Sequence, residues 1–248
     1  MSSLNPIGHP FIELRTVEST NNYAMGLARA AMAQHGTAVF AHDQTTGKGQ
    51  RNREWVSAPG QNIALSLILE AEYLDPSRIF LLSMTVALAT SKFFNRFIEE
   101  NIRIKWPNDI YWRDRKAAGI LIENLWQGNH WKYAVAGIGV NVNQKEFGTL
   151  STKAVSLAII TGKTFEAMKL AKTLCQDLNS SFNLLLTNPD AVACEYRKRL
   201  YKLNETVRLK KDNRIFEATI KDVSIDGRLV VQHATEESFE VGEVEWVL

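Results

Sequence analysis

The segment between Arg103 and Val142 constrains the fold more than any other part of this chain. It holds four short β-rich runs, RIKW, DIYW, KAAGILIEN and WKYAVAGIGVNV. Turn residues separate these runs, as at the Arg113–Asp114–Arg115 corner, and the alternation of strand and turn chemistry is typical of neighbouring strands. The pattern predicts a series of short strands separated by turns.

Strand and helix patterns also flank this segment. Ahead of it, strands are predicted at FIELRTV (11–17), TAVFAHDQ (37–44) and the apolar NIALSLILE (62–70). An alanine-rich helix follows the N-cap candidates Ser19 and Thr20 and stops at Gly36. A long amphipathic helix is expected over 75–100, with Pro76 in its first turn.

Beyond Gly162 the pattern becomes helical and then returns to strands. A core-facing stripe of helical spacing runs through Met168, Ala171, Leu174, Leu178, Phe182 and Leu185. A shorter helix is expected after Pro189. The last fifty or so residues hold closely spaced short strands, VRLKK, RIFEATIKDV, GRLVVQH and FEVGEVEWVL, which favour a small barrel. We therefore predict an α+β domain over 1–200 and an SH3-like barrel over 201–248.

Composition narrows the class of protein. The 248 residues are 45% hydrophobic and 23% charged, which is ordinary for a globular chain that can bury a sizeable core. Lys and Arg number 29 against 27 Asp and Glu, a net charge of +2. This balance argues against a duplex-DNA binder, which carries an excess of positive charge on one face.

Several features point to the cytoplasm. No stretch approaches the ~20 apolar residues of a membrane span. The first residues lack the basic segment and the apolar segment of a signal peptide. Cys175 and Cys194 form no CxxC pair and are expected to be buried thiols, with a disulfide as the less favoured alternative. The five histidines are scattered, so no metal site made by the protein alone is predicted.

One polar loop concentrates positive charge around two glycines. Residues 43–55 read DQTTGKGQRNREW, with Lys48, Arg51 and Arg53 close together. Glycine lets backbone N–H groups approach phosphate oxygens, and arginine can hold a phosphate with two parallel hydrogen bonds. The run matches neither a GxGxxG nor a Walker A pattern. Taken alone, it fits a solvated surface loop better than an anion site.

A second stretch, KWPNDIYWRDRKAAGIL at 105–121, carries further candidates. Pro107 makes Trp106 extended, so Asn108 and Asp109 fall at a strand edge where side chains can face a cleft. Lys116 opens an apolar strand that contains Gly119. A hairpin with charged corners and a glycine bulge explains the same residues. Periodicity does not distinguish this hairpin from a group of site residues that face a cleft.

Taken together, these motifs resemble those of a biotin protein ligase. KWPNDIY…DRKAAGIL, the glycine-and-cation loop ending in Trp55, the early STNNYA and the later GIGVNVN stand in that family's order over nearly the whole chain. KWPND followed by RKxxGIL is specific for this family, whereas STN alone would not indicate it. The resemblance implies a mixed-sheet catalytic domain like that of class II aminoacyl-tRNA synthetases.

The resemblance also implies a reaction. Biotin and ATP would form biotinyl-5′-AMP with release of pyrophosphate, and biotin would then pass to one lysine of a biotin carboxyl carrier protein of a carboxylase. Two anions must meet in the first step, and unit charges ~4 Å apart repel by roughly 4 kcal/mol at an effective dielectric near 20. Positioned cations, with Mg²⁺ on the ATP, would remove that barrier.

Site residues follow from the resemblance position by position. Lys116, Asp109 and Arg51 would be catalytic, with Lys116 bridging biotin's carboxylate and the α-phosphate and Asp109 orienting Lys116 or accepting the carrier lysine's proton. Biotin would contact Ser19, Thr20, Asn21, Gln44, Gly47, Lys48, Lys116 and Gly119. ATP or the adenylate would contact Lys48, Gln50, Arg51, Arg53, Trp55, Asn108, Gly139 and Asn141. Phe147 is either a base-stacking or an ordinary core aromatic.

The chain departs from the family pattern in two respects. Gln50 stands where an arginine that retains the adenylate is usual, so weaker retention is expected unless Arg51 or Arg53 compensates. The fifteen residues before Thr16 are too few for a helix-turn-helix, which implies the short form without DNA binding. The resemblance leaves a homodimer open. The alternatives are a lipoate–protein ligase, a nucleic-acid-binding protein and a biotin-binding regulator without catalysis.

Overall fold

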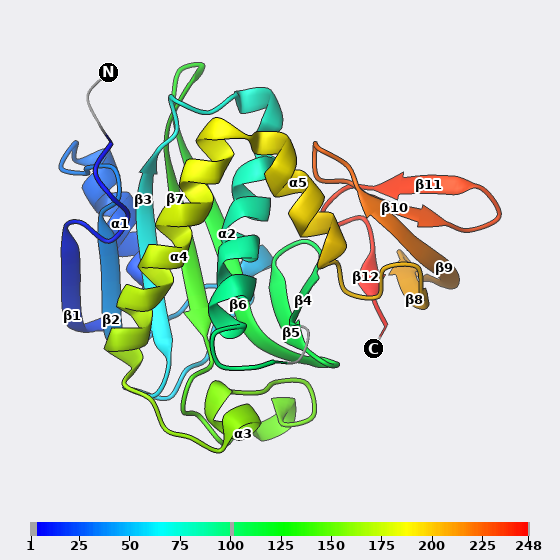
Figure 1. Ribbon diagram of the computed structural model, residues 1–248, viewed down its shortest axis with the longest axis horizontal. Coiled ribbons are helices and arrows are strands. Elements are labelled where there is room, and N and C mark those ends of the chain that lie inside the picture. Colours follow the sequence, from blue (N-terminus) through cyan, green and yellow to red (C-terminus); the bar gives the residue numbers. More distant parts are fainter. Residues whose placement is uncertain (1–3, 100–101, 248) are drawn as a thin grey trace.

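The first part of the protein is built on a seven-stranded mixed sheet, seen in a computed structural model that describes residues 4–99 and 102–247 (Figure 1). The strand order is β1-β2-β3-β7-β6-β5-β4, and among the described strands of this sheet only β1 and β2 pair in parallel. The strands are β1 Phe11–Val17, β2 Ala38–Gln44, β3 Ile63–Glu70, β4 Ile102–Lys105, β5 Asp109–Trp112, β6 Arg115–Gln127 and β7 His130–Val140. The strands predicted from the sequence are confirmed.

Helices cover both faces of this sheet, which explains why β3 is buried and mostly apolar, with Ser66 inside it and Glu70 at its end. On one face, α1 (Thr20–Arg29) packs on Val39, Ile68 and Val135. On the other face, α2 (Phe80–Phe94) and α4 (Ala167–Thr187) close the main core. The remaining helical elements are η1 Gln50–Asn52, η2 Pro76–Arg78, η3 Gly148–Leu150, α3 Leu157–Thr161 and α5 Pro189–Lys198. A strand buried on both faces reads as a continuous hydrophobic run rather than an alternating one.

The stripe predicted for α4 is confirmed, but the prediction for α2 is wrong in its start, its end and its amphipathic character. From Ala171 to Leu185 the stripe residues of α4 are buried, and Met168 is half-buried. By contrast, α2 ends at Phe94, follows a separate 3₁₀ turn at Pro76, and is not amphipathic, because α4 and α5 cover the side that the sheet leaves open (Figure 1). Glu100, its expected end, lies outside the described residues.

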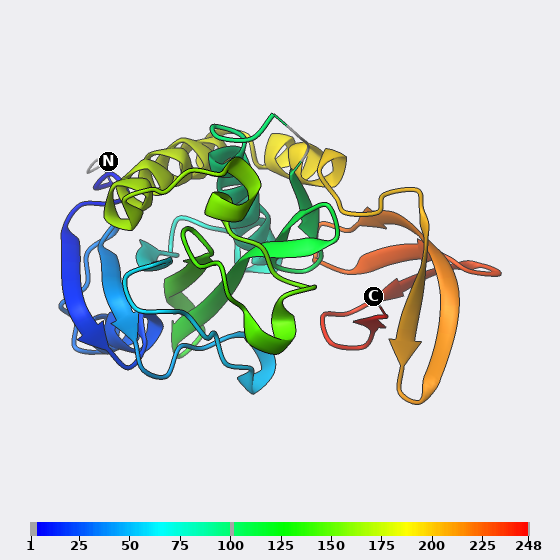
Figure 2. The same cartoon turned by 90° about the horizontal axis from the view of Figure 1, so that it is seen from below.

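A second, five-stranded antiparallel sheet follows, in the order β11-β10-β9-β8-β12. Its strands are β8 Thr206–Lys211, β9 Arg214–Val223, β10 Leu229–Gln232, β11 Glu236–Phe239 and β12 Glu245–Trp246. Figures 1 and 2 both show it as a distinct group beside β4 and β5. The prediction of closely spaced C-terminal strands is confirmed.

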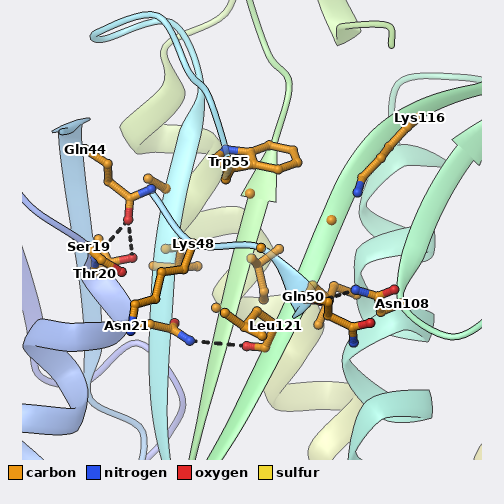
Figure 3. A pocket seen from close by; sticks show the side chains of 18 residues that line it. Ser19, Thr20, Asn21, Gln44, Lys48, Gln50, Trp55, Asn108, Lys116 and Leu121 are labelled. Atoms are coloured by element: carbon orange, nitrogen blue, oxygen red, sulfur yellow. Dashed lines mark hydrogen bonds between the residues drawn. The ribbon is translucent and has the colours of Figure 1, made fainter. Parts of the chain in front are cut away.

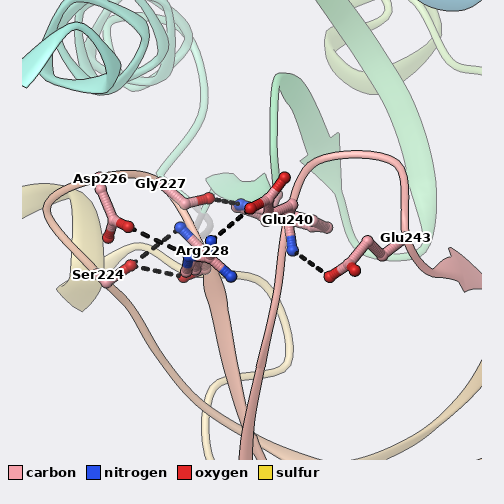
Figure 4. Close-up of polar contacts among 7 residues, drawn as sticks. Ser224, Asp226, Gly227, Arg228, Glu240 and Glu243 are labelled. Atoms are coloured by element: carbon pink, nitrogen blue, oxygen red, sulfur yellow. Dashed lines mark hydrogen bonds and ion pairs between the residues drawn. The ribbon is translucent and has the colours of Figure 1, made fainter.

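Specific contacts hold the second sheet against the first. Trp106 Nε1 donates to the carbonyl of Gly227 at 2.9 Å, and a Cβ at Gly227 would collide with the Phe80 ring. Next to this contact, Arg228 pairs with Asp226 and Glu240, which ties the β9–β10 turn to the segment after β11 (Figure 4). The polar network therefore anchors the second sheet on the tryptophan of the KWPND motif.

Two further expectations are settled by the fold. Cys175 is buried in α4 as predicted, but the prediction for Cys194 is wrong, because that residue lies on the exposed face of the surface helix α5; both thiols are free. Within residues 4–99 and 102–247, no helix combines the length and the apolar character that crossing a bilayer requires.

Candidate active site

A cavity opens on the α1 face of the first sheet, and most of the predicted site residues line it (Figure 3). Its floor is the pairing of β6 with β7, its polar end is the start of α1 with Gln44 at the end of β2, and the loop after β2 forms its cover. The predicted residues that line it are Ser19, Thr20, Asn21, Gln44, Lys48, Gln50, Trp55, Asn108, Lys116, Gly119 and Gly139. The loop and Lys116 thus share one cavity.

The polar end is a hydrogen-bonded cluster at the first turn of α1. Ser19 caps the helix by accepting from the backbone N–H of Asn22. Gln44 Oε1 accepts from the Thr20 N–H at 2.8 Å and lies 3.0 Å from the Thr20 hydroxyl oxygen. Because a side-chain amide has one oxygen and one NH₂ group, this arrangement leaves the Gln44 NH₂ as an available donor.

The floor of the cavity is made of glycines, and the Trp55 ring lies on them. A Cβ on Gly139 would collide with the indole, and one on Gly119 would lie 3.1 Å from it. The indole Nε1 is buried and has no hydrogen-bond partner within the described part of the chain. Gly119 and Gly139 face each other across β6 and β7, so the two strands form a flat surface at this point.

At the opposite end of the cavity, Lys116 of the lining forms an ion pair with Asp109, which lies outside the lining. Lys116 Nζ lies 2.6 Å from Asp109 Oδ1, with Lys116 on β6 and Asp109 at the start of β5. Lys116 Nζ also stands 5.6 Å from the centre of the Trp55 ring, at cation–π distance. Backbone hydrogen bonds to Lys153 and Val155 fix the main chain of Lys116, and the ion pair with Asp109 holds its ammonium group at the cavity.

The glycine-and-cation loop is a tight closed turn. The Trp55 N–H donates to the Gly47 carbonyl at 2.8 Å, and the Gly49 N–H donates to the Arg53 carbonyl at 2.7 Å. The backbone of Arg51 is left-handed, with φ 54°. Lys48 and Gln50 point to the cavity, whereas Gly47 lies behind Gln44 outside the lining. The Gly49 N–H is therefore engaged within the loop.

Two predicted phosphate contacts, Arg51 and Arg53, lie outside the cavity lining. Their guanidinium groups are 3.8 and 3.9 Å from Glu245 Oε1 of β12, and the Arg51 guanidinium also packs on Gly242. The cation loop therefore contacts the second sheet. The sequence could not indicate this, because Glu245 is one acidic residue among many in the C-terminal strands.

The two predicted asparagines hold the backbone around the cavity. Asn108 lines the cavity, and its Nδ2 donates to the Ile120 carbonyl at 2.5 Å. Asn141 is buried and donates to the carbonyls of Val155 and Lys116 instead of lining the cavity. Phe147 is half-buried and outside the lining.

Lys105 is not among the predicted site residues. It faces Asp109 across the β4–β5 pair, and its ammonium lies over the rings of Tyr111 and of Trp246 from the second sheet. Burial lowers the pKa of Lys105 to about 8, Asp109 opposes that shift, and Lys116 and Arg53 add to it. Its position directly across the turn from Asp109 is the signal that could have identified it.

The mixed seven-stranded sheet with helices on both faces has the fold of the solved biotin protein ligases. The solved biotin protein ligase of Aquifex aeolicus in complex with biotin and ATP superposes with a TM-score of 0.80, covering 95% of this chain and 97% of that chain at 24% identity. At that identity the likeness establishes the fold. A biotin protein ligase of Leishmania major in complex with biotinyl-5-AMP gives a TM-score of 0.66.

Sequence comparison then identifies the family. The Biotin/lipoate A/B protein ligase family matches residues 13–141, and the biotin protein ligase C-terminal domain matches residues 202–246. The chain belongs to this family. It is 30% identical to the bifunctional ligase/repressor BirA of Escherichia coli over 69% of this chain and 53% of BirA, and 33% identical to the biotin–[acetyl-CoA-carboxylase] ligase of Paracoccus denitrificans over 62% and 64%. The chain spans about half the length of the bifunctional relatives it matches.

Proposed function

We propose that this protein is an ATP-dependent biotin–protein ligase. It would activate biotin to biotinyl-5′-AMP and transfer the biotinyl group to a lysine of the biotin carboxyl carrier protein of acetyl-CoA carboxylase or a related carboxylase. The observation that carries the proposal is one cavity with a neutral hydrogen-bonding end at Thr20 and Gln44 and a charged end at Lys116.

The neutral end suits a cyclic urea. The Gln44 NH₂ is an available donor for a carbonyl oxygen, and the hydroxyls of Ser19 and Thr20 can accept from ring N–H groups. Burial makes each unmatched polar group costly, so a ligand without such groups would leave this end unsatisfied. Biotin carries both the carbonyl and the N–H groups on its ureido ring.

The charged end suits an encounter between two anions. Biotin's carboxylate oxygen would attack the α-phosphorus of ATP, the bond to the bridging oxygen would break, and pyrophosphate would leave with that electron pair. Lys116 would lie between the carboxylate and the α-phosphate, and Lys48 would add a second positive charge from the loop. Arg51 and Arg53 would join the phosphates after leaving Glu245, because their present ion pairs are long and exposed.

Asp109 would serve the transfer step. The carrier lysine's amine would attack the acyl carbon of the adenylate, AMP would leave, and the nitrogen would lose a proton. An amine with an ordinary pKa of ~10.4 is mostly protonated at neutral pH, so a base is needed. Asp109 is the carboxylate paired with Lys116 beside the cavity, and the arrival of two anions near Lys116 would weaken that pair.

Mg²⁺ would enter bound to ATP. Within the described ranges no three or more His, Cys, Asp or Glu residues form a metal-binding group, so the phosphate oxygens would supply most of its ligands. It would neutralise phosphate charge.

We further infer that the first domain is related to class II aminoacyl-tRNA synthetases and that the second domain is an SH3-like barrel. We also infer that the protein acts in the cytoplasm and does not bind DNA. Its proposed function is compatible with a homodimer.

The direct test incubates purified protein with biotin, Mg²⁺-ATP and a biotin carrier domain. Mass spectrometry of the carrier should show one added biotinyl group that depends on ATP, and Lys116→Ala should abolish the addition. A carrier that stays unmodified with wild-type protein under saturating substrates would overturn the proposal. A carrier whose target lysine is replaced by arginine is the matched negative control.

A lipoate–protein ligase is the second candidate, because the matching family includes both activities. Lipoate's dithiolane ring has no N–H or carbonyl group to match Gln44 and Thr20, which favours biotin. Radiolabelled biotin and lipoate offered in parallel, each with its own carrier domain, separate the two. Transfer of lipoate but not biotin would replace the proposed substrate.

A further inference from the structure

A carboxylate outside the cavity holds the polar end of the site in place. Asn21 Nδ2 donates to Glu123 Oε2 at 2.9 Å and more weakly to the Leu121 carbonyl at 3.4 Å. Glu123 lies on β6 and is not among the residues that line the cavity, whereas Asn21 is (Figure 3). Glu123 thus reaches the site only through another side chain.

The sheet provides the path for this contact. Ser66 on β3, Gly137 on β7 and Leu121 on β6 lie in one row across the strands, and Asn21 from α1 lies over that row. A Cβ on Gly137 would collide with the Asn21 amide oxygen. The bare backbone of Gly137 is therefore what lets Asn21 extend from α1 as far as Glu123.

Glu123 selects the orientation of the Asn21 amide. The two ends of this amide have nearly the same shape, but an ionised carboxylate can only accept hydrogen bonds. It therefore takes the NH₂ end and turns the Asn21 oxygen toward Ser66, whose Oγ lies 2.6 Å away. Ser66 is fully buried and is also 2.7 Å from Thr20 Oγ1.

The orientation of Asn21 then determines where the Ser66 proton goes. A hydroxyl has one proton, and the Asn21 oxygen can contribute none to this contact, so the Ser66 O–H donates to Asn21, and the proton of the Ser66–Thr20 contact comes from the Thr20 hydroxyl. The Thr20 oxygen consequently keeps its accepting capacity for a ligand N–H. In the reverse amide orientation Ser66 would donate to Thr20, and that capacity would be used internally.

We propose that Glu123 is a positioning residue that determines the affinity of the site for the ureido ring, acting through Asn21 and Ser66 on the Thr20 hydroxyl. The inference rests on the proposed function, because it concerns recognition of the same ring. The inference adds to the site a residue, Glu123, that contacts neither biotin nor ATP. It also means that the NH₂ group of Asn21 binds Glu123 and is not a donor to the ligand.

Calorimetric titration of the full chain with biotin and, separately, with ATP tests the proposal. Glu123→Ala should raise the Kd for biotin about tenfold, the loss expected for one hydrogen bond to a charged partner, and leave the Kd for ATP unchanged. Glu123→Gln should give a smaller rise, because its amide allows either orientation of Asn21, and it remains informative if Glu123→Ala does not fold. Glu236→Ala, which removes an exposed carboxylate from β11, is the matched control.

A double-mutant cycle shows whether Glu123 acts through Asn21. In an Asn21→Ala background, Glu123→Ala should add no further loss of biotin affinity. Unchanged biotin affinity in both Glu123 variants, or full addition of the two losses in the double variant, would overturn the inference. Wild-type protein that binds no biotin would instead overturn the proposed function, so the two failures are distinct.

Discussion

Asp109 and Lys116 form a 2.6 Å ion pair between β5 and β6, although six residues of turn and strand separate them in the chain. The backbone register explains the meeting: pairing shifts between Ile110 and Tyr111, so that Asp109 lies opposite Gly119 while Lys116 pairs with Tyr111. Because Gly119 has no side chain, the Lys116 ammonium can extend over it, 3.0 Å from where its Cβ would lie. The pair places the cation and the carboxylate of the site side by side.

Replacing Asp109 by asparagine should separate the two steps of the reaction. The change removes a base but keeps a polar group of the same size, so biotin transfer to the carrier should slow about 100-fold, within the range for general-base catalysis. Adenylate formation should slow much less. Single-turnover assays of each half-reaction measure both rates, and equal losses in the two steps would remove the assignment of Asp109 to transfer.

Replacing Gln50 by arginine should slow release of the adenylate. Gln50 lines the cavity, and an arginine there can hold the phosphate with two charge-assisted hydrogen bonds. We expect the dissociation rate of biotinyl-5′-AMP to fall about tenfold, which corresponds to ~1.4 kcal/mol. Stopped-flow chase with unlabelled biotin measures it, with Gln50→Ala as the control that should not slow release. A Gln50→Arg variant with the dissociation rate of wild type would show that residue 50 does not control retention of the adenylate.

A methyl group on Gly139 should displace the cover of the cavity. The added Cβ would overlap the Trp55 indole, so Gly139→Ala should lower the free energy of unfolding by about 1–3 kcal/mol or move the ring and weaken biotin binding. Gly26→Ala in α1 is the control, because nothing lies within 4 Å of its added Cβ. Urea unfolding and biotin titration check both variants. No change in either quantity for Gly139→Ala would show that Trp55 does not rest on this strand.

Lys105 should make stability depend on pH. Its pKa is lowered to about 8 in the folded protein, whereas in the unfolded chain it returns to the ordinary value of ~10.4. Between these values the unfolded chain binds more protons, so the free energy of unfolding should rise with pH from about 8 to about 10. Urea unfolding at several pH values measures the slope.

Lys105→Met is the control for this slope. It removes the titrating group while keeping much of the side-chain volume over Tyr111 and Trp246. The difference between wild type and variant isolates Lys105 from the buried tyrosines, whose raised pKa values act in the opposite direction above pH 10. An identical pH slope in the two proteins would show that Lys105 is as exposed as an ordinary surface lysine.

The sequence predicted local elements well where one periodicity applied along a whole segment. The strand at 11–17 and the stripe of α4 follow directly from spacing. The error at α2 has a tertiary cause, because burial of this helix by α4 and α5 is decided by residues much later in the chain. The exposure of Cys194 has the same cause, since it depends on which face of α5 meets the core.

The same distinction holds for the site. Residues inside the motifs, such as Thr20 and Lys116, could be chosen from the chain, because the motif itself places them at strand and helix ends. Glu123 could have been found by noticing that Gly119, Leu121 and Glu123 share one face of β6. The pairing of Arg51 with Glu245 could not, because it joins two loops that only the packing of the two sheets brings together.

Biotin-dependent exchange of labelled pyrophosphate into ATP tests the central claim most directly, because it reports the meeting of carboxylate and α-phosphorus without any carrier protein. Wild type should catalyse exchange only when biotin is present, and Lys116→Ala should reduce the rate at least 100-fold, as expected when a group that stabilises developing charge is lost. Exchange that proceeds without biotin, or at the wild-type rate in Lys116→Ala, would contradict the account.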